Sequence, residues 1–120
     1  MTKISLSLFV LLVFAASCTY YNIEETYKDF IPDCDTSAVS YTQDIAPILD
    51  MNCTMCHGSA FPEAGLDLTV YNNVSANKEL IKDRINRPLG DPSVMPQSGP
   101  MVQCNIDLIN AWINQGALNN

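Results

Sequence analysis

Two cysteines and a histidine within one run of five residues constrain this chain more than any other feature. The run reads Cys53-Thr54-Met55-Cys56-His57. Its two-residue gap places both thiols at the edge of a porphyrin, where they can add across the two vinyl groups and form thioethers. The adjacent imidazole then faces the iron. The run therefore predicts one covalently attached haem c with His57 as an axial ligand.

Two other chemistries use paired cysteines, and both fit this sequence less well. A thioredoxin-like dithiol needs a strand–helix setting, and we find no convincing strand pattern. A zinc site needs four ligands. Cys34 and Cys104 could join the Cys53–His57 run to supply them, but their spacings match no usual zinc pattern.

The first residues have the pattern of an export signal. Lys3 opens a short positive region, an apolar run follows over residues 4–14, and three small residues then precede Cys18. The apolar run has the length of the hydrophobic core of a signal peptide, and it is too short to span a membrane comfortably. We predict a signal peptide over residues 1–17 and a lipid on the Cys18 thiol. The alternative is an ordinary cleaved signal with an incidental cysteine.

Acidic residues dominate the charge of the chain. Its formal net charge is −7, which repels nucleic acid and anionic lipid headgroups, so neither is predicted as a partner. We interpret residues 18–39 as a lipidated N-terminus followed by an acidic linker, and residues 40–120 as the folded domain. The expected location is the cell envelope, facing the periplasm, with the lipid as the membrane anchor.

The five cysteines of the chain can all be assigned. Cys18 is expected to carry lipid, and Cys53 and Cys56 to carry haem. Cys34 and Cys104 are then left to form a disulfide, which an exported protein can keep. The alternatives are free thiols or a different pairing.

Hydrophobic periodicity predicts about three helices in residues 40–120. The first begins between Ser40 and Asp44 and ends near Asn52, and Asp44 is the favoured cap because Pro47 is tolerated only near a helix start. Two further helices are expected over residues 77–87 and 105–115.

Long loops separate these helices. Residues 57–76 read as an irregular loop with a short turn near Tyr71. Residues 88–103 hold four prolines and two glycines and read as a stiff, extended loop. A domain of this size with so much loop is marginal on its own core, so we expect the loops to pack on a large apolar cofactor.

Several runs together resemble class I c-type cytochromes, most closely the short bacterial lipoprotein monohaem cytochromes. The matching runs are Tyr41–Leu49, Cys53–Gly58, Gly65–Leu68, Met95-Pro96 with Gly99-Pro100, and Ala111–Ile113 with Gly116-Ala117. The resemblance implies a small all-α domain in which the first and last helices cross, long loops wrap one haem and the haem edge is exposed. Gln97 departs from the pattern, since relatives often have a second proline there.

A second axial ligand is expected from a methionine. His57 is the only histidine of the chain, which excludes bis-histidine ligation. Met51 and Met55 lie beside the thioether run and are better suited to packing. Met95 and Met101 lie in the proline-rich loop, and Met95 is ranked first because it carries the Met-Pro match.

Other residues have supporting roles in this prediction. We expect a backbone carbonyl between Phe61 and Gly65 to accept the Nδ1–H of His57. Four apolar side chains are candidates either for the haem crevice or for ordinary core: Leu66, Leu68, Ile85 and Trp112.

The predicted function is transfer of single electrons between redox protein partners. The sequence shows no base, nucleophile or substrate pocket, so we predict neither an enzyme nor a small-molecule substrate. The alternative is a haem protein with an open sixth site, such as a peroxidase or a gas sensor.

Overall fold

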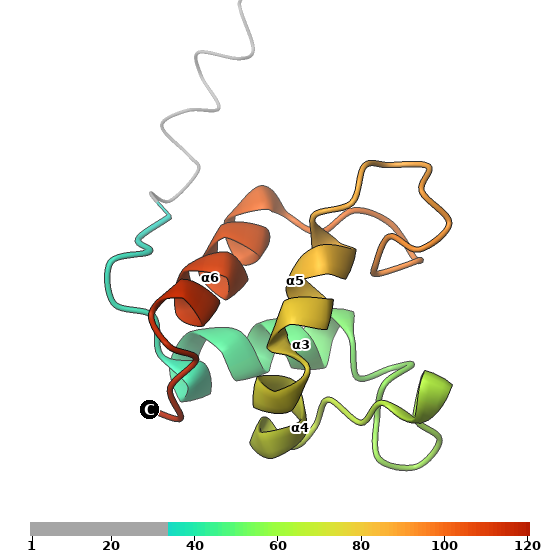
Figure 1. Ribbon diagram of the computed structural model, residues 1–120, viewed down its shortest axis with the longest axis horizontal. Coiled ribbons are helices and arrows are strands. Elements are labelled where there is room, and N and C mark those ends of the chain that lie inside the picture. Colours follow the sequence, from blue (N-terminus) through green and yellow to red (C-terminus); the bar gives the residue numbers. More distant parts are fainter. Residues whose placement is uncertain (1–33) are drawn as a thin grey trace, which may run out of the picture. The chain divides into compact units, whose positions relative to one another are not determined.

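The computed structural model describes residues 34–120 (Figure 1). The expected signal peptide over residues 1–17, the lipid site at Cys18 and the linker as far as residue 33 lie outside the described residues. The compact unit begins at Cys34. In this part of the chain the regular elements are all helices, so the predicted all-α class is confirmed. None of the described helices is long and apolar enough to cross a membrane.

The first helical segment begins within the expected range of Ser40 to Asp44, but with a different cap. It consists of a π-helical turn, η1 (Tyr41–Ile45), followed by α3 (Ala46–Asn52). Its cap is Ser40, whose hydroxyl accepts from the Gln43 N–H, and the Ser40 N–H donates to the Asp44 carboxylate at 2.8 Å. The preference for Asp44 as the cap was therefore wrong. The π turn provides the reason, because a helix that starts there and becomes α-helical at Ala46 still has Pro47 in the first turn of α3.

Three more α-helices follow, one more than predicted. They are α4 (Tyr71–Ala76), α5 (Lys78–Ile85) and α6 (Gln103–Asn114). The short turn expected near Tyr71 is helix α4, which meets α5 at Asn77. Gly116 follows α6 with a positive φ of 101°, the conformation of a helix C-terminal stop.

Aromatic side chains connect α6 to the first helical segment. Trp112 of α6 is 1% exposed, and its ring centroid lies 5.5 Å from that of Tyr41. Tyr41 in turn meets Tyr71 of α4 edge-on at 4.9 Å. Helix α6 also packs against α5, and the two lie side by side in Figure 1. The buried core comprises Val39, Tyr41, Ile45, Ile48, Leu49, Leu68, Val74, Ile81, Ile85, Met101, Ile109, Trp112, Ile113 and Ala117.

The last residue of the chain closes the start of the first helical segment. The main-chain oxygen of Asn120 accepts from the Thr42 N–H at 3.0 Å and from the Ser40 hydroxyl at 3.0 Å. Its side-chain oxygen accepts from the Tyr41 N–H at 2.8 Å. The first N–H groups of a helix have no acceptor within the helix. Asn120 provides hydrogen-bond acceptors for two of them, the N–H groups of Tyr41 and Thr42.

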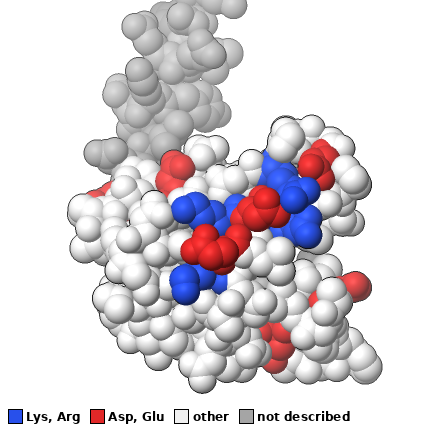
Figure 2. All heavy atoms as spheres, viewed as in Figure 1, with Lys and Arg blue, Asp and Glu red and all other residues white. Residues whose placement is uncertain are grey.

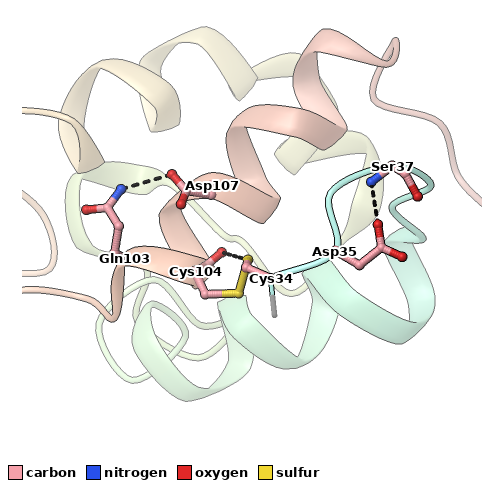
Figure 3. The surroundings of a disulfide bond; sticks show 6 residues. All are labelled: Cys34, Asp35, Ser37, Gln103, Cys104 and Asp107. Atoms are coloured by element: carbon pink, nitrogen blue, oxygen red, sulfur yellow. Dashed lines mark hydrogen bonds between the residues drawn. A yellow bond between two sulfur atoms is a disulfide. The ribbon is translucent and has the colours of Figure 1, made fainter. Parts of the chain in front are cut away.

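A disulfide joins the first described residue to the last helix. Cys34 and Cys104 are bonded, with their Cα atoms 5.6 Å apart and 70 residues between them in sequence. Figure 3 shows the bridge at the beginning of α6, near the hydrogen bond from Gln103 to Asp107. The structure thus brings together the two cysteines that sequence reasoning paired.

Removing this bridge should destabilise the domain substantially. A cross-link across about 70 residues restricts the unfolded chain, and loop-closure entropy gives a contribution of about 4 kcal/mol. We expect the C34S/C104S double variant to lose about that much free energy of unfolding in denaturant titrations. Reduction of the unmutated protein should produce the same loss, and unchanged denaturation midpoints in both experiments would contradict the prediction.

Candidate functional site

The Cys53–His57 run forms tight turns directly after α3. The N–H groups of Cys53 and Thr54 donate to the Leu49 carbonyl, which ends the helix. The Cys53 carbonyl then accepts from the N–H groups of Cys56 at 3.1 Å and His57 at 2.8 Å. The helix end and these two bonds fix the backbone that carries both thiols and the imidazole.

His57 is held at three points. Besides its N–H bond to Cys53, its carbonyl accepts from the Leu68 N–H at 2.8 Å. Its Nδ1 lies 3.2 Å from the Leu66 carbonyl oxygen. A carbonyl oxygen can only accept, so the neutral ring carries its proton on Nδ1 and leaves the Nε2 lone pair free. This tautomer and orientation suit a metal-binding histidine.

The identity of the carbonyl differs from the sequence expectation. The expected partner lay between Phe61 and Gly65, but the structure uses Leu66. The 3₁₀ turn η2 (Glu63–Gly65) explains the shift, because the Gly65 and Leu66 N–H groups turn inward to Pro62 and Glu63. The Leu66 carbonyl is the first after this turn to reach the imidazole.

The two thiols are free and differ in environment. Cys56 is exposed, whereas Cys53 is half-buried and packs against the core. Burial raises the pKa of the Cys53 thiol to about 11. A catalytic dithiol needs a thiol with a lowered pKa, because the thiolate is the attacking species. The environment of Cys53 therefore disfavours thioredoxin-like chemistry.

The zinc alternative loses two of its potential ligands. Cys34 and Cys104 are bonded to each other, and a disulfide sulfur does not serve as a thiolate ligand. Within residues 34–120, no three side chains of His, Cys, Asp or Glu gather closely enough to hold a metal ion.

Met95 lies on a separate loop beyond α5. Its N–H donates to the Arg84 carbonyl at 3.1 Å, which fixes the loop to the end of α5. Arg87 pairs with Asp83 at 2.9 Å and Asp91 at 3.3 Å, and Asp91 accepts from the Ser93 N–H. The loop is therefore a series of turns that fold back on α5, and the expectation of an extended segment was wrong. The four prolines stiffen turns here instead of straightening the chain.

The other methionines have different surroundings. Met101 is 8% exposed and belongs to the core cluster, so its sulfur is committed to packing. Met51 and Met55 are largely exposed, and their expected role as packing residues within the described fold was wrong. Met95 is half-buried on its loop.

The residues present fit a haem in their donor set. Two free thiols and a bare imidazole nitrogen stand in one turn, and a thioether stands on the loop after α5. Leu89, on the loop after α5, is 74% exposed, so a large apolar side chain is available there to a cofactor. Both loops project on the same side of α5 in the view of Figure 1. Leu68, Ile85 and Trp112 belong instead to the buried core.

Comparison with protein-family models, with curated proteins and with solved structures finds no match to this chain.

Gly58 is required by the backbone turn that carries the site. A Cβ built on it would lie 2.5 Å from the Thr54 carbonyl oxygen, closer than real Cβ atoms approach. We expect Gly58→Ala to displace this turn and to lower the free energy of unfolding by about 1–3 kcal/mol. Thermal unfolding monitored by circular dichroism measures the change. Gly90→Ala is an informative comparison, since its Cβ meets no atom within 4 Å and its cost arises only from the positive φ.

Proposed function

We propose that this chain is a monohaem c-type cytochrome of the class I type that carries single electrons between redox proteins of the bacterial envelope. In this proposal Cys53 and Cys56 would hold haem c covalently, and His57 and Met95 would bind its iron. Export depends on residues 1–17, and a lipid on Cys18 attaches the protein to a membrane on the periplasmic side. The observation that carries the proposal is the His57 imidazole, whose Nδ1 is fixed by Leu66 beside two free thiols.

The haem would supply reversible one-electron exchange at iron, and the chain's own residues would set its conditions. The Leu66 carbonyl keeps the His57 proton on Nδ1 and leaves the Nε2 lone pair free to bind a metal. A thioether from Met95, if bound to the iron, would favour the reduced metal, because sulfur is a soft ligand. The hydrogen bond from Met95 to Arg84 limits the positions that this sulfur can take. Two filled axial positions suit electron transfer better than substrate chemistry.

Covalent attachment is the first test of the proposal. Protein from the membrane fraction of the native host should give the pyridine haemochrome spectrum of haem c, and the haem should stay with the protein in acidified organic solvent. Cys53→Ala or Cys56→Ala should leave at most one thioether and a poorly folded product. Haem that extracts from the unmutated protein, or a protein without haem, would contradict the proposal.

The axial methionine provides the second test. Met95→Ala should abolish the weak far-red ferric absorption that marks sulfur bonded to iron, lower the reduction potential and allow carbon monoxide to bind. Met101→Ala should retain that absorption and instead cost about 2–5 kcal/mol of unfolding free energy, because it empties a core position. Visible spectra, redox titrations and denaturant titrations of the two variants measure these effects.

The opposite outcomes distinguish the alternatives. Loss of the absorption only in Met101→Ala would transfer the ligand role to Met101. If the unmutated ferric protein lacks the absorption and binds carbon monoxide avidly, the alternative hypothesis is favoured: a haem protein with an open sixth site, such as a peroxidase or gas sensor.

A further inference from the structure

A shallow recess lies beside the thiol-bearing turn. It has a volume of about 350 Å³, and its lining includes Thr54, Met55, Phe61 and Thr69. Met55 and Phe61 are 87% and 91% exposed, so two large apolar side chains stand in water at the same place. Exposed apolar side chains grouped around a hollow are typical of a contact surface.

Two carboxylates are hydrogen-bonded to residues that line this recess. The Thr54 hydroxyl lies 2.9 Å from the main-chain oxygen of Asp50 and 3.1 Å from its carboxylate. The Asp67 carboxylate accepts from the Thr69 N–H at 2.9 Å and from the Thr69 hydroxyl at 2.6 Å. The side chain and then the backbone of Thr69 lower the pKa of Asp67. Both threonines line the recess, so each holds a negatively charged side chain within hydrogen-bond distance of the lining.

A third carboxylate belongs to the same loop. Glu63 follows Phe61 closely, and its N–H donates to the Cys56 carbonyl at 2.9 Å. The backbone of Glu63 is thereby tied to the thiol-bearing turn, and its exposed side chain is free to meet a partner. The name acidic recess is used below for the hollow together with Asp50, Glu63 and Asp67.

Positive charge is confined to another part of the described chain. All lysines and arginines of residues 34–120 lie between Lys78 and Arg87. Figure 2 shows them grouped over α5 and interleaved with acidic side chains, whereas the acidic atoms at the lower right have no basic neighbour on this face. Figure 1 places the loop after α3 in that lower right region. Within residues 34–120, no lysine or arginine forms an ion pair with Asp50, Glu63 or Asp67.

We propose that the acidic recess is the docking surface for a basic redox protein, whose lysine or arginine side chains surround an apolar contact that meets Met55 and Phe61. Charge complementarity selects this occupant. That the partner exchanges electrons rests on the proposed function, whereas the charge and shape of the surface do not. Complementary charges of this kind raise association rates and orient the partner, and the apolar centre supplies contact once water is expelled.

Two other occupants fit the observations less well. A second copy of the chain would bring another negatively charged domain, and its basic residues on α5 are already interleaved with Glu79 and Asp83. An anionic membrane surface would be repelled by the same three carboxylates.

The experiment titrates the isotope-labelled full-length protein with a strongly basic monohaem cytochrome as the probe. Amide shifts are recorded by NMR at several salt concentrations. We expect localised, saturable shifts at Thr54, Phe61 and Thr69, and an affinity that falls as salt rises. The variant D50N/E63Q/D67N should weaken binding about tenfold at low ionic strength. Asparagine keeps the acceptor oxygen that each threonine uses, so the recess should retain its shape.

The control variant removes the same charge elsewhere. D35N/E79Q/D107N neutralises three carboxylates outside the recess and should bind the probe nearly as the unmutated protein does. Phe61→Ser should weaken binding at every salt concentration while leaving the salt dependence unchanged.

Several results would overturn this proposal. Equal weakening in both triple variants would mean attraction by net charge alone. Shifts centred elsewhere, or no saturable shifts at low salt, would exclude the surface. The same amides shifting with protein concentration alone, or with zwitterionic vesicles, would identify a second copy or a membrane as the occupant.

A pyridine haemochrome assay on the labelled protein, made before the probe is added, separates the two proposals. Localised binding to a protein without haem would refute the cytochrome function and leave the docking surface standing. A haem-containing protein without localised binding would do the reverse.

Discussion

The contact between Trp112 and Tyr41 is the constraint on which the rest of the domain depends. It joins the last helix to the first helical segment, with 5.5 Å between the two ring centroids. The Tyr41 ring also contacts the Tyr71 ring, with their centroids 4.9 Å apart. Aromatic pairs of this kind contribute about 0.5–1.5 kcal/mol beyond the area they bury. Two of the three rings also make a hydrogen bond: the Trp112 indole N–H donates to the Leu118 carbonyl, and the Tyr71 hydroxyl donates to the Ala117 carbonyl. Packing and hydrogen bonding therefore hold the residues after α6 against η1, α4 and α6.

The candidate site consists of loops attached to this core at a few buried residues. Leu49 and Leu68 are both nearly inaccessible to solvent, and they lie before and after the segment that holds the two free thiols. Ile85 is buried at the end of α5, from which the Met95 loop departs. The segment between Leu49 and Leu68 exposes Met51, Met55 and Phe61, and the loop after Ile85 exposes Leu89. The rigid part of the domain thus positions the ends of the loops, and local hydrogen bonds decide the rest.

The sequence was sufficient for the features that periodicity and motif spacing encode. Amphipathic spacing located α5 and α6 within a few residues, and the count of cysteines led to the Cys34–Cys104 pair that the structure contains. Helix α4 was missed because a segment of six residues is too short to show a helical period. The favoured cap of the first helix was misplaced at Asp44, because propensity rules treat Pro47 as part of an α-helix and do not anticipate a π turn before it.

The fine geometry of the site depends on contacts that sequence patterns do not record. Expecting a carbonyl near the imidazole was sound, but the 3₁₀ turn at residues 63–65 decided that it belongs to Leu66. Thr54 and Thr69 line the recess from opposite ends of a loop, so no local sequence motif predicts it. Side chain–carboxylate bonds at Asp67 give a partial signal, since an Asp two residues before a Thr is a common turn.

The position of the disulfide also determines how the domain responds to mechanical force. Tension applied to the chain ahead of Cys34 enters the fold through a covalent bond to Cys104 at the beginning of α6. A pull between that point and the chain end would therefore load α6 and the residues after it. Residues 35–103, which carry the two thiols, His57 and Met95, would lie outside the loaded path. The covalent path of a force applied at the N-terminal side therefore bypasses the segments that carry the two thiols, His57 and Met95.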